Sequence, residues 1–313
     1  MKISVVIPTR NRDKYLDNTL NSLVNQTLDQ ECYEVIVIDN GSSDRTRAIC
    51  RKYSKKIKNF KYLYDKRPGL HVGRNRGFLE SRSDIILYAD DDVIGSRTWL
   101  QGIIDGFVDD SVALVGGNVY PRFESEKPAW YNQFIVKDGE YTYVTQLSLI
   151  WSKSKKIKTI NPYYVFGCNF GVRKKILEEC GGFHPDGMPN NLLMYRGDGE
   201  SYVSRYISEH NYRAVFNPIA SVEHMIPKIR TTERYLSQSG LKNGISDMYC
   251  ILRNKNLMDA ALQYKKDLMT FRKEKNGSRK IYLRFVCRGE MYLLTYYILY
   301  KEIRKWVKKS NYL

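Results

Sequence analysis

The sequence predicts an α/β fold in which a mostly parallel central sheet is flanked by helices, with a helical extension at the C-terminal end. Short apolar runs alternate with stretches of helical spacing over the first 95 residues, a pattern typical of a parallel sheet covered on both faces. The chain has 313 residues, of which 42% are apolar, so a sizeable core can form. The last sixty or so residues are rich in Lys, Arg, Tyr and Leu instead.

Four predicted strands follow one another in the first half, each ending in a polar loop. KISVVIPT leads into TRNRD, after which Leu16, Leu20 and Leu23 recur at helical spacing. YEVIVIDN leads into NGSSD and a helix through Tyr53. A weaker strand at KYLYD leads through RPGLHVGRNRG into another helix, and DIILYA is the fourth strand. Ligands bind at the carboxyl ends of such strands, so we expect these loops to converge on one site.

The pattern changes after Gly95. ALVGGNVYP predicts a strand, and TINPYYVFGCNFGVRKKILEECGGF predicts a pair of strands and a helix that ends at Gly181. YRAVFNP predicts a short strand, and helices are expected from about Thr231 onward. No flexible linker is visible, and we expect a boundary near residue 240.

Three features limit the class of protein. The six cysteines form no C-x-x-C pair, which favours reduced thiols in a cytoplasmic protein. No signal pattern is visible at the N-terminus. The longest apolar run, MYLLTYYILY, has ten residues and is too short for a bilayer core of roughly 30 Å.

The stretch YADDDVIG places three aspartates directly after a buried strand. Side chains alternate in extended chain, so Asp90 and Asp92 share one face while Asp91 points the other way. Two carboxylates on one face suit Mg²⁺ or Mn²⁺, which keep positions open for phosphate oxygens. A solvated acidic turn is the competing interpretation.

Two further loops carry candidate binding residues. Asp39 ends the second strand, where its carboxylate can accept the imide N–H of a uracil or thymine ring, while Asp44 is as suited to capping a helix as to binding. Arg74 and Asn75 lie in a glycine-containing loop, and such arginines suit a nucleotide or its diphosphate.

The order VVIPTRNR, VIVIDNGSSDRT, GLHVGRNRG and ADDD resembles the family 2 glycosyltransferases of the GT-A fold, which include bacterial polysaccharide sugar transferases. The resemblance continues in GCNFGVRKKILEECGGF, RGDGESYVSRY and NPIASVEHMIP, so it covers residues 3–245. It implies a glycosyltransferase domain at 1–240, with a nucleotide-binding half at 1–95 and an acceptor-side half at 96–240, followed by a basic helical extension at 241–313.

The resemblance also implies roles for individual residues. Asp92 and His224 would hold the metal, Mn²⁺ or Mg²⁺, against the donor diphosphate. Contacts to the nucleotide sugar would come from Pro8, Thr9, Arg10, Asp39, Arg74, Asn75, Asp90 and Asp91.

The catalytic base is where the sequence departs from the family pattern. Relatives have G-E-D before a helix, whereas this chain has RGDGES. Counting forward from Phe183 favours Asp198, and counting back from Pro218 and His224 favours Glu200. We give a slight preference to Glu200, with the other carboxylate as a helix cap.

The resemblance implies transfer of a sugar from a nucleoside diphosphate sugar, with UDP or dTDP favoured, and inversion at the anomeric carbon. The acceptor would be a hydroxyl of a glycan or lipid-linked acceptor in cell-surface polysaccharide synthesis. Trp130 and Tyr131 are candidates for stacking on an acceptor sugar. A sugar-phosphate nucleotidyltransferase is the alternative enzyme, but it would need a glycine-rich loop after the first strand, and IPTRNRDK has no glycine.

The C-terminal segment has a charge pattern of its own. From Ile251 to Leu313 there are sixteen Lys and Arg residues and five Asp and Glu residues. Basic and aromatic residues interleave in RKIYLRF and LYKEIRKWVKK, which suits a helix on an anionic membrane surface at the inner face of the cell membrane. A solvated basic helix and a non-enzymatic membrane-binding protein are the alternatives, and nucleic acid fits poorly beside an acidic site.

Overall fold

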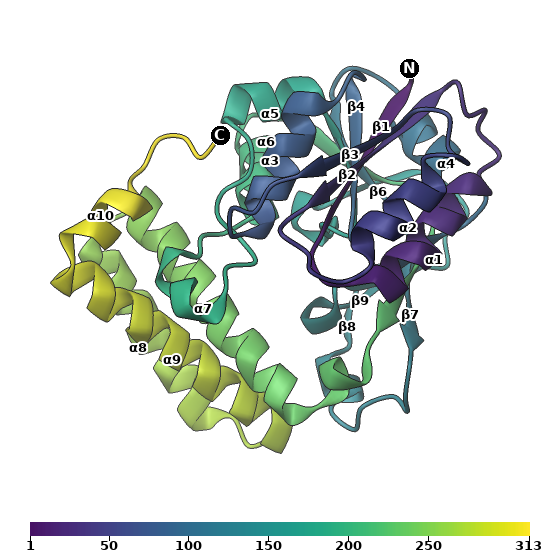
Figure 1. The fold of residues 1–313 in the computed structure, drawn as a ribbon. Helices are drawn as coiled ribbons and strands as arrows, with labels where there is room; N and C mark the ends of the chain where they lie inside the picture. The colour runs from purple at the N-terminus through teal and green to yellow at the C-terminus, as the bar shows by residue number, and fades with distance from the viewer.

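The computed structural model describes residues 1–313, and an eight-stranded sheet forms its centre (Figure 1). Its strand order is β11-β13-β6-β12-β4-β1-β2-β3. The four N-terminal strands run parallel, whereas β12 runs antiparallel between β4 and β6. The strands of this sheet are β1 (Ile3–Thr9), β2 (Tyr33–Asp39), β3 (Phe60–Tyr64), β4 (Ile85–Ala89), β6 (Val112–Gly116), β11 (Lys158–Ile160), β12 (Asn169–Arg173) and β13 (Arg213–Phe216).

Helices cover both faces of this sheet. Helices α1 and α2 pack together on one side, and α3, α5 and α6 gather on the other (Figure 1). Every residue of β1 and β2 is therefore buried, whereas the edge strand β3 is only partly covered. The predicted α/β arrangement is confirmed. The helices are α1 (Asp13–Val24), α2 (Thr46–Tyr53), α3 (Leu70–Glu80), α4 (Trp99–Gly106), α5 (Lys174–Cys180) and α6 (Glu200–Glu209).

A second, six-stranded sheet begins directly after the row of aspartates. Its order is β5-β14-β7-β10-β9-β8. In its first pair, His224 of β14 lies opposite Val93 of β5, so the pairing brings a histidine from late in the chain beside Asp92. The strands are β5 (Val93–Gly95), β7 (Val119–Phe123), β8 (Val136–Asp138), β9 (Tyr141–Val144), β10 (Leu149–Ser152) and β14 (Val222–Ile226).

Four helices form the C-terminal extension, which has a small core of its own. Helices α7 and α9 pack backbone against backbone, because glycines face the partner helix. A Cβ on Gly244 would lie 2.0 Å from the carbonyl oxygen of Val286, and one on Gly289 would lie 2.1 Å from that of Leu241. The helices are α7 (Glu233–Asn254), α8 (Leu257–Lys273), α9 (Gly277–Leu299) and α10 (Lys301–Val307).

The helical extension begins earlier than residue 240. Helix α7 starts at Glu233 and continues without a break to Asn254, so the boundary expected near 240 falls inside this helix. The last residues return to the sheet domain, where the indole N–H of Trp306 donates to the carbonyl of Tyr195 at 2.9 Å. None of the helices combines the length and the apolar content that a membrane crossing requires.

Candidate active site

Two cavities meet at the carboxyl end of β4. The smaller has a volume of about 330 Å³ and the larger about 560 Å³, and Leu70 and Asp90 line both. The smaller cavity is formed by the loops after β1, β2 and β4, as the predicted convergence requires. The larger cavity lies between the sheet domain and the extension, and its lining includes Arg74, Asp186 and Glu200 together with one face of α7.

The three aspartates have different surroundings. Asp91 is buried and turns toward the end of β1, where the hydroxyl of Thr9 donates to its Oδ2 at 2.6 Å and the Nε of Arg12 lies 2.7 Å from its Oδ1. Burial raises the pKa of Asp91 to about 7, although Arg12 opposes the shift. Asp90 lies at the junction of the two cavities, while Asp92 turns toward β14.

Asp90, Asp92 and His224 form a group that can hold a divalent metal, since one ligand atom from each lies within 4.8 Å of the others. Nδ1 of His224 lies 3.0 Å from the carbonyl oxygen of Leu147. Donation to that carbonyl leaves Nε2 with its lone pair, which accepts from Nη1 of Arg230 at 3.1 Å and lies 3.3 Å from Oδ1 of Asp92. This Oδ1 is buried and has no hydrogen-bond partner. The group therefore offers two carboxylates and a neutral imidazole, and the Oδ1 of Asp92 has no other partner. Such a set of ligands fits Mn²⁺ or Mg²⁺.

Two arginines surround the same aspartates. Arg12 forms an ion pair with Asp92, and the Nη2 of Arg230 lies 3.6 Å from its Oδ2. Burial alone would raise the pKa of Asp92, but the contact with His224 and the charges of Arg230 and Arg12 outweigh burial and hold the pKa below its usual range. No motif or spacing in the sequence singles out Arg230. Arg12 could have been predicted as a residue of this site from the sequence, because it follows Thr9 in the loop at the end of β1.

Arg74 links the metal group to the larger cavity. It is buried at the end of α3's first turn, with Nη1 2.7 Å from Oε2 of Glu200, 3.9 Å from Asp186 and Nη2 4.0 Å from Asp90. Burial disfavours its charge, but the three carboxylates raise its pKa above the usual value. Arg74 therefore lies against the carboxylates of Asp186 and Glu200, and it does not line the smaller cavity.

Asp198 and Glu200 point in different directions because Gly199 separates them with a positive φ of 54°. A Cβ at this glycine would lie 2.7 Å from Oδ2 of Asp186, so no other residue fits without rearrangement. Glu200 is the first residue of α6, and 28% of its side chain is exposed. Both residues line the larger cavity, but the Glu200 side chain is partly exposed whereas the Asp198 side chain is almost fully buried.

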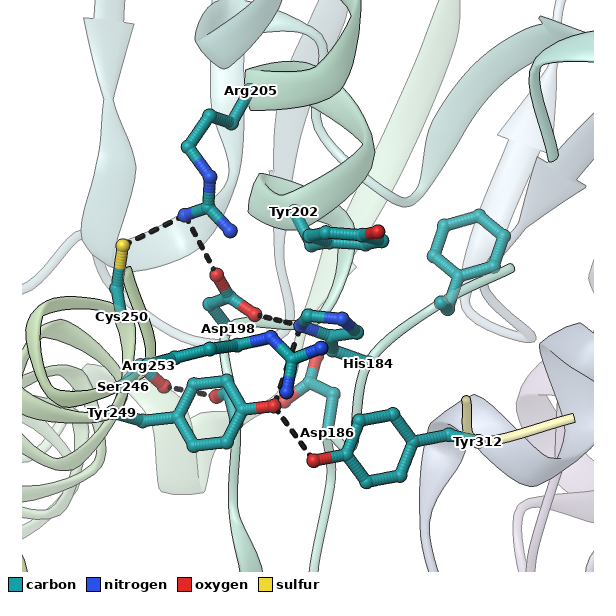
Figure 2. Close-up of polar contacts among 12 residues, drawn as sticks. His184, Asp186, Asp198, Tyr202, Arg205, Ser246, Tyr249, Cys250, Arg253 and Tyr312 are labelled. Carbon is teal, nitrogen blue, oxygen red and sulfur yellow. Dashed lines mark hydrogen bonds and ion pairs between the residues drawn. The ribbon is translucent and has the colours of Figure 1, made fainter. Parts of the chain in front are cut away.

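Figure 2 shows the buried network around Asp198. Its Oδ1 lies 2.7 Å from Nδ1 of His184, and its Oδ2 accepts a hydrogen bond from Arg205 at 2.9 Å. The hydroxyl of Tyr249, from α7, lies 3.4 Å from the same Nδ1 and 2.9 Å from the hydroxyl of Tyr312. Only 4% of the Asp198 side chain is exposed, so both its oxygens already serve a structural network.

The remaining predicted residues divide into two groups. Pro8, Thr9 and Arg10 line the smaller cavity. Asp39 and Asn75 line neither cavity. Asp39 accepts hydrogen bonds from the backbone N–H of Ser42 and the hydroxyl of Tyr62, both at 2.7 Å.

Asn75 and the two candidate aromatic residues have structural surroundings. The amide of Asn75 donates to the carbonyl of Phe183 and accepts from its N–H, so it fastens α3 to the loop before α6. Trp130 and Tyr131 are buried, and the indole of Trp130 donates to the carbonyl of Thr231. The expectation of nucleotide or acceptor contacts for these three residues finds no support in their positions.

Comparison with known proteins agrees with this geometry. The family model described as glycosyl transferase family 2 matches residues 4–181, which include the loops after β1, β2 and β4. The chain belongs to glycosyl transferase family 2. Its sequence is 29% identical over 217 residues to glycosyltransferase AglE of Haloferax volcanii, a match that covers 68% of this chain and 64% of the relative. The match thus spans less than two thirds of that glycosyltransferase.

Solved glycosyltransferase structures share the fold at low identity. The mannosyltransferase PcManGT of Pyrobaculum calidifontis, solved with GDP-Man and Mn²⁺, aligns over 99% of this chain and 84% of its own with a TM-score of 0.57 and 16% identity. TarS 1–349 of S. aureus, solved with UDP-GlcNAc, aligns over 98% of this chain and 78% of its own with a TM-score of 0.53 and 16% identity. The predicted GT-A fold is confirmed.

Proposed function

We propose that this chain transfers a sugar from a nucleoside diphosphate sugar to an acceptor hydroxyl, with inversion at the anomeric carbon. The observation that supports this best is the meeting of the two cavities at Asp90. One cavity carries the aspartates and His224 at its edge, and the other carries Glu200, whose carboxylate lies beside Arg74 and thus near Asp90. A donor in the smaller cavity and an acceptor in the larger cavity can therefore approach each other at Asp90.

The smaller cavity would take the donor. UDP or dTDP is favoured, as the family resemblance implies; Asp39 itself lines neither cavity, but its neighbour Asn40 lines this one. Asp90, Asp92 and His224 would hold Mn²⁺ or Mg²⁺. When bound, the metal neutralises charge that develops on the departing diphosphate. Arg12 and Arg230 lie beside the same group and add positive charge where the phosphates would be.

Glu200 would act as the general base. An oxygen of Glu200 takes the proton of the acceptor hydroxyl while the hydroxyl oxygen forms a bond to the anomeric carbon. The bond from that carbon to the phosphate oxygen breaks, and its electrons leave with the diphosphate. One carboxylate suffices for this single displacement. Arg74, at 2.7 Å, holds the Glu200 side chain in place.

The larger cavity would take the acceptor, and the extension supplies one of its walls. Along α7 a polar face turns toward the cavity, formed by Tyr235, Gln238, Ser239, Lys242, Asn243, Ser246 and Asp247. Arg74 and Arg196 in this cavity pair with carboxylates, whereas no carboxylate lies within 4.0 Å of Lys242. Hydroxyl and amide groups suit a glycan, and the unpaired ammonium suits an anionic group on that glycan.

A panel of UDP-, dTDP-, GDP- and CMP-sugars, assayed with Mn²⁺ for release of the nucleotide (the nucleoside diphosphate, or CMP from the CMP-sugars), tests this function. We expect turnover with one donor and its loss in Asp92→Ala, while Asp110→Ala, which alters an exposed aspartate, keeps full activity. Release of pyrophosphate from a nucleoside triphosphate and a sugar phosphate would identify a nucleotidyltransferase instead. Full activity of Asp92→Ala would overturn the proposal.

The acceptor would be a glycan or lipid-linked acceptor of cell-surface polysaccharide synthesis, presented at the inner face of the cell membrane. The excess of Lys and Arg after residue 250 supports this part of the proposal.

A further inference from the structure

We infer that the outward face of α8 docks on an anionic membrane surface. The inference goes beyond sugar transfer and does not depend on it. It rests on three exposed apolar side chains, on the basic residues that flank them, and on the packing of the opposite face of the same helix.

The exposed apolar residues of α8 form one stripe. Met258, Leu262 and Met269 are 69%, 59% and 48% exposed. With about 100° of rotation per residue, these three positions lie within an arc of roughly 40°. Soluble proteins rarely expose aligned large apolar side chains without a partner, and no other segment of the chain covers them.

Basic residues lie on both sides of this stripe. The same helical geometry places Lys265 and Arg272 along one edge and Lys266 and Lys273 along the other, and all four are exposed. Long basic side chains can lay their methylene groups along an apolar surface and extend their charges to lipid headgroups. An apolar stripe between two basic edges is the pattern of a helix that lies in a membrane interface.

The inner face of α8 holds the helix in the bundle. Ala260 is fully buried in the core of the extension, and Tyr264 packs against that core. Asn256 caps the helix, its side chain accepting from the N–H of Asp259 at 3.0 Å. In Figure 1, α8 and α9 lie on the side of α7 away from the central sheet. No residue of α8 lines either cavity, so docking through α8 leaves both accessible.

The charges favour a lipid surface over a second copy of the chain. Two copies joined through this stripe would bring eight basic side chains together in a chain with a net charge of +17, and such like charges repel. Anionic headgroups compensate these charges, while the acyl boundary receives the methionines and the leucine.

Helix α8 is not one of the two segments that the charge pattern of the sequence suggested for membrane binding, RKIYLRF and LYKEIRKWVKK. In the second of these, Ile303 and Val307 are 2% and 0% exposed, and the indole of Trp306 bonds to Tyr195. In the first, Tyr282 and Phe285 are partly covered against α7. These side chains stabilise the extension and cannot enter a membrane, whereas Leu299 and Tyr300 of the second segment are exposed but do not form a stripe along a helix. We therefore assign the expected role to α8.

Flotation of the full chain with vesicles tests the inference. We expect binding to vesicles containing phosphatidylglycerol at low salt, weaker binding at high salt, and little binding to phosphatidylcholine alone. The triple variant Met258→Ser, Leu262→Ser, Met269→Ser keeps every charge and should bind at least about tenfold more weakly. Lys265→Gln with Lys266→Gln should weaken binding about thirtyfold. Lys155→Gln with Lys156→Gln changes the net charge equally, at exposed sites outside α8, and should bind like the unaltered protein.

Circular dichroism checks that each variant is folded, and light scattering after size exclusion reports the oligomer. Absence of flotation at low salt, or equal flotation of the triple variant and the unaltered chain, would overturn the inference. So would a dimer that the triple substitution converts to a monomer, because the stripe would then be a protein interface. None of these readouts requires donor turnover, so failure of the proposed function would be seen separately.

Discussion

The Nη1 of Arg74 lies 2.7 Å from Oε2 of Glu200, although the two residues are 126 positions apart in the chain. The same guanidinium faces Asp90 at 4.0 Å. One buried arginine thus connects the first residue of α6 with the aspartates after β4, and the proposed base is held beside the proposed donor site.

Asp198→Asn should mainly destabilise the protein. The substitution removes the charge that faces Arg205 and His184, and it leaves a largely buried guanidinium without its carboxylate. We expect a loss of about 3 kcal/mol in the free energy of unfolding, measured by denaturant titration. At a temperature where the variant is folded, its turnover should stay within a few-fold of the unaltered protein. A stable but inactive variant would show that Asp198 is the base.

His224→Ala should weaken metal binding. The substitution removes the Nε2 that faces Asp92 at 3.3 Å, so we expect the affinity for Mn²⁺ to fall at least about tenfold, as measured by electron paramagnetic resonance. The control is His210→Ala, because His210 is exposed at the end of α6. Equal Mn²⁺ affinity in the two variants would remove His224 from the metal site.

Lys242→Ala should act on the acceptor alone. Loss of one charge-assisted hydrogen bond corresponds to about 1.5–3 kcal/mol, so the acceptor KM should rise about ten- to a hundredfold while the donor KM stays unchanged. The matched control is Lys255→Ala, at the exposed end of the same helix. Acceptors that carry phosphate, carboxylate or no charge would identify the group that Lys242 binds. An increase in donor KM would place Lys242 at the diphosphate instead.

Glu290→Gln should change how stability depends on pH. Burial raises the pKa of Glu290 to about 9, and Asp267 and Asp247 add to the shift. The folded state therefore keeps a proton that the unfolded state releases above its pKa of about 4.5, so stability falls as pH rises from about 4.5 to 9. Between pH 4.5 and 7 the difference between variant and unaltered protein should change by about 3 kcal/mol.

Chemical denaturation at several pH values measures this difference. Glu302→Gln, at an exposed position on α10, should show no such pH dependence. A constant difference between Glu290→Gln and the unaltered protein across this range would contradict a proton held at Glu290.

The parallel half of the fold was readable in the sequence for a physical reason. Strands buried on both faces are continuous apolar runs, and their carboxyl ends meet at one edge of the sheet. Thr9 and Asp39 are paired in register at that edge. Side-chain alternation after β4 pointed to Asp90 and Asp92, and the resemblance to a known family added His224, which the pairing of β5 with β14 brings beside Asp92. The order of the motifs along the chain predicted that His224 lies near Asp92, whereas the local spacing of apolar residues could not predict a contact between such distant segments.

Other features depend on contacts that a sequence pattern does not contain. The choice between Asp198 and Glu200 turns on the positive φ of Gly199. Asn75 was expected in a binding loop, yet it lies in α3 and its amide is used by Phe183. The boundary expected near residue 240 falls inside α7, which has no break there. The exposed stripe on α8 is visible only once the packed faces of the extension are known.

The most direct test of the central claim is the turnover number of Glu200→Gln with the donor found by the panel, compared with Glu209→Gln at the exposed end of the same helix. General base catalysis contributes about 10²- to 10⁴-fold, so we predict a loss of that size for Glu200→Gln, with donor affinity and melting temperature unchanged and Glu209→Gln fully active. Turnover of Glu200→Gln within a few-fold of the unaltered protein would contradict the assignment of Glu200 as the base.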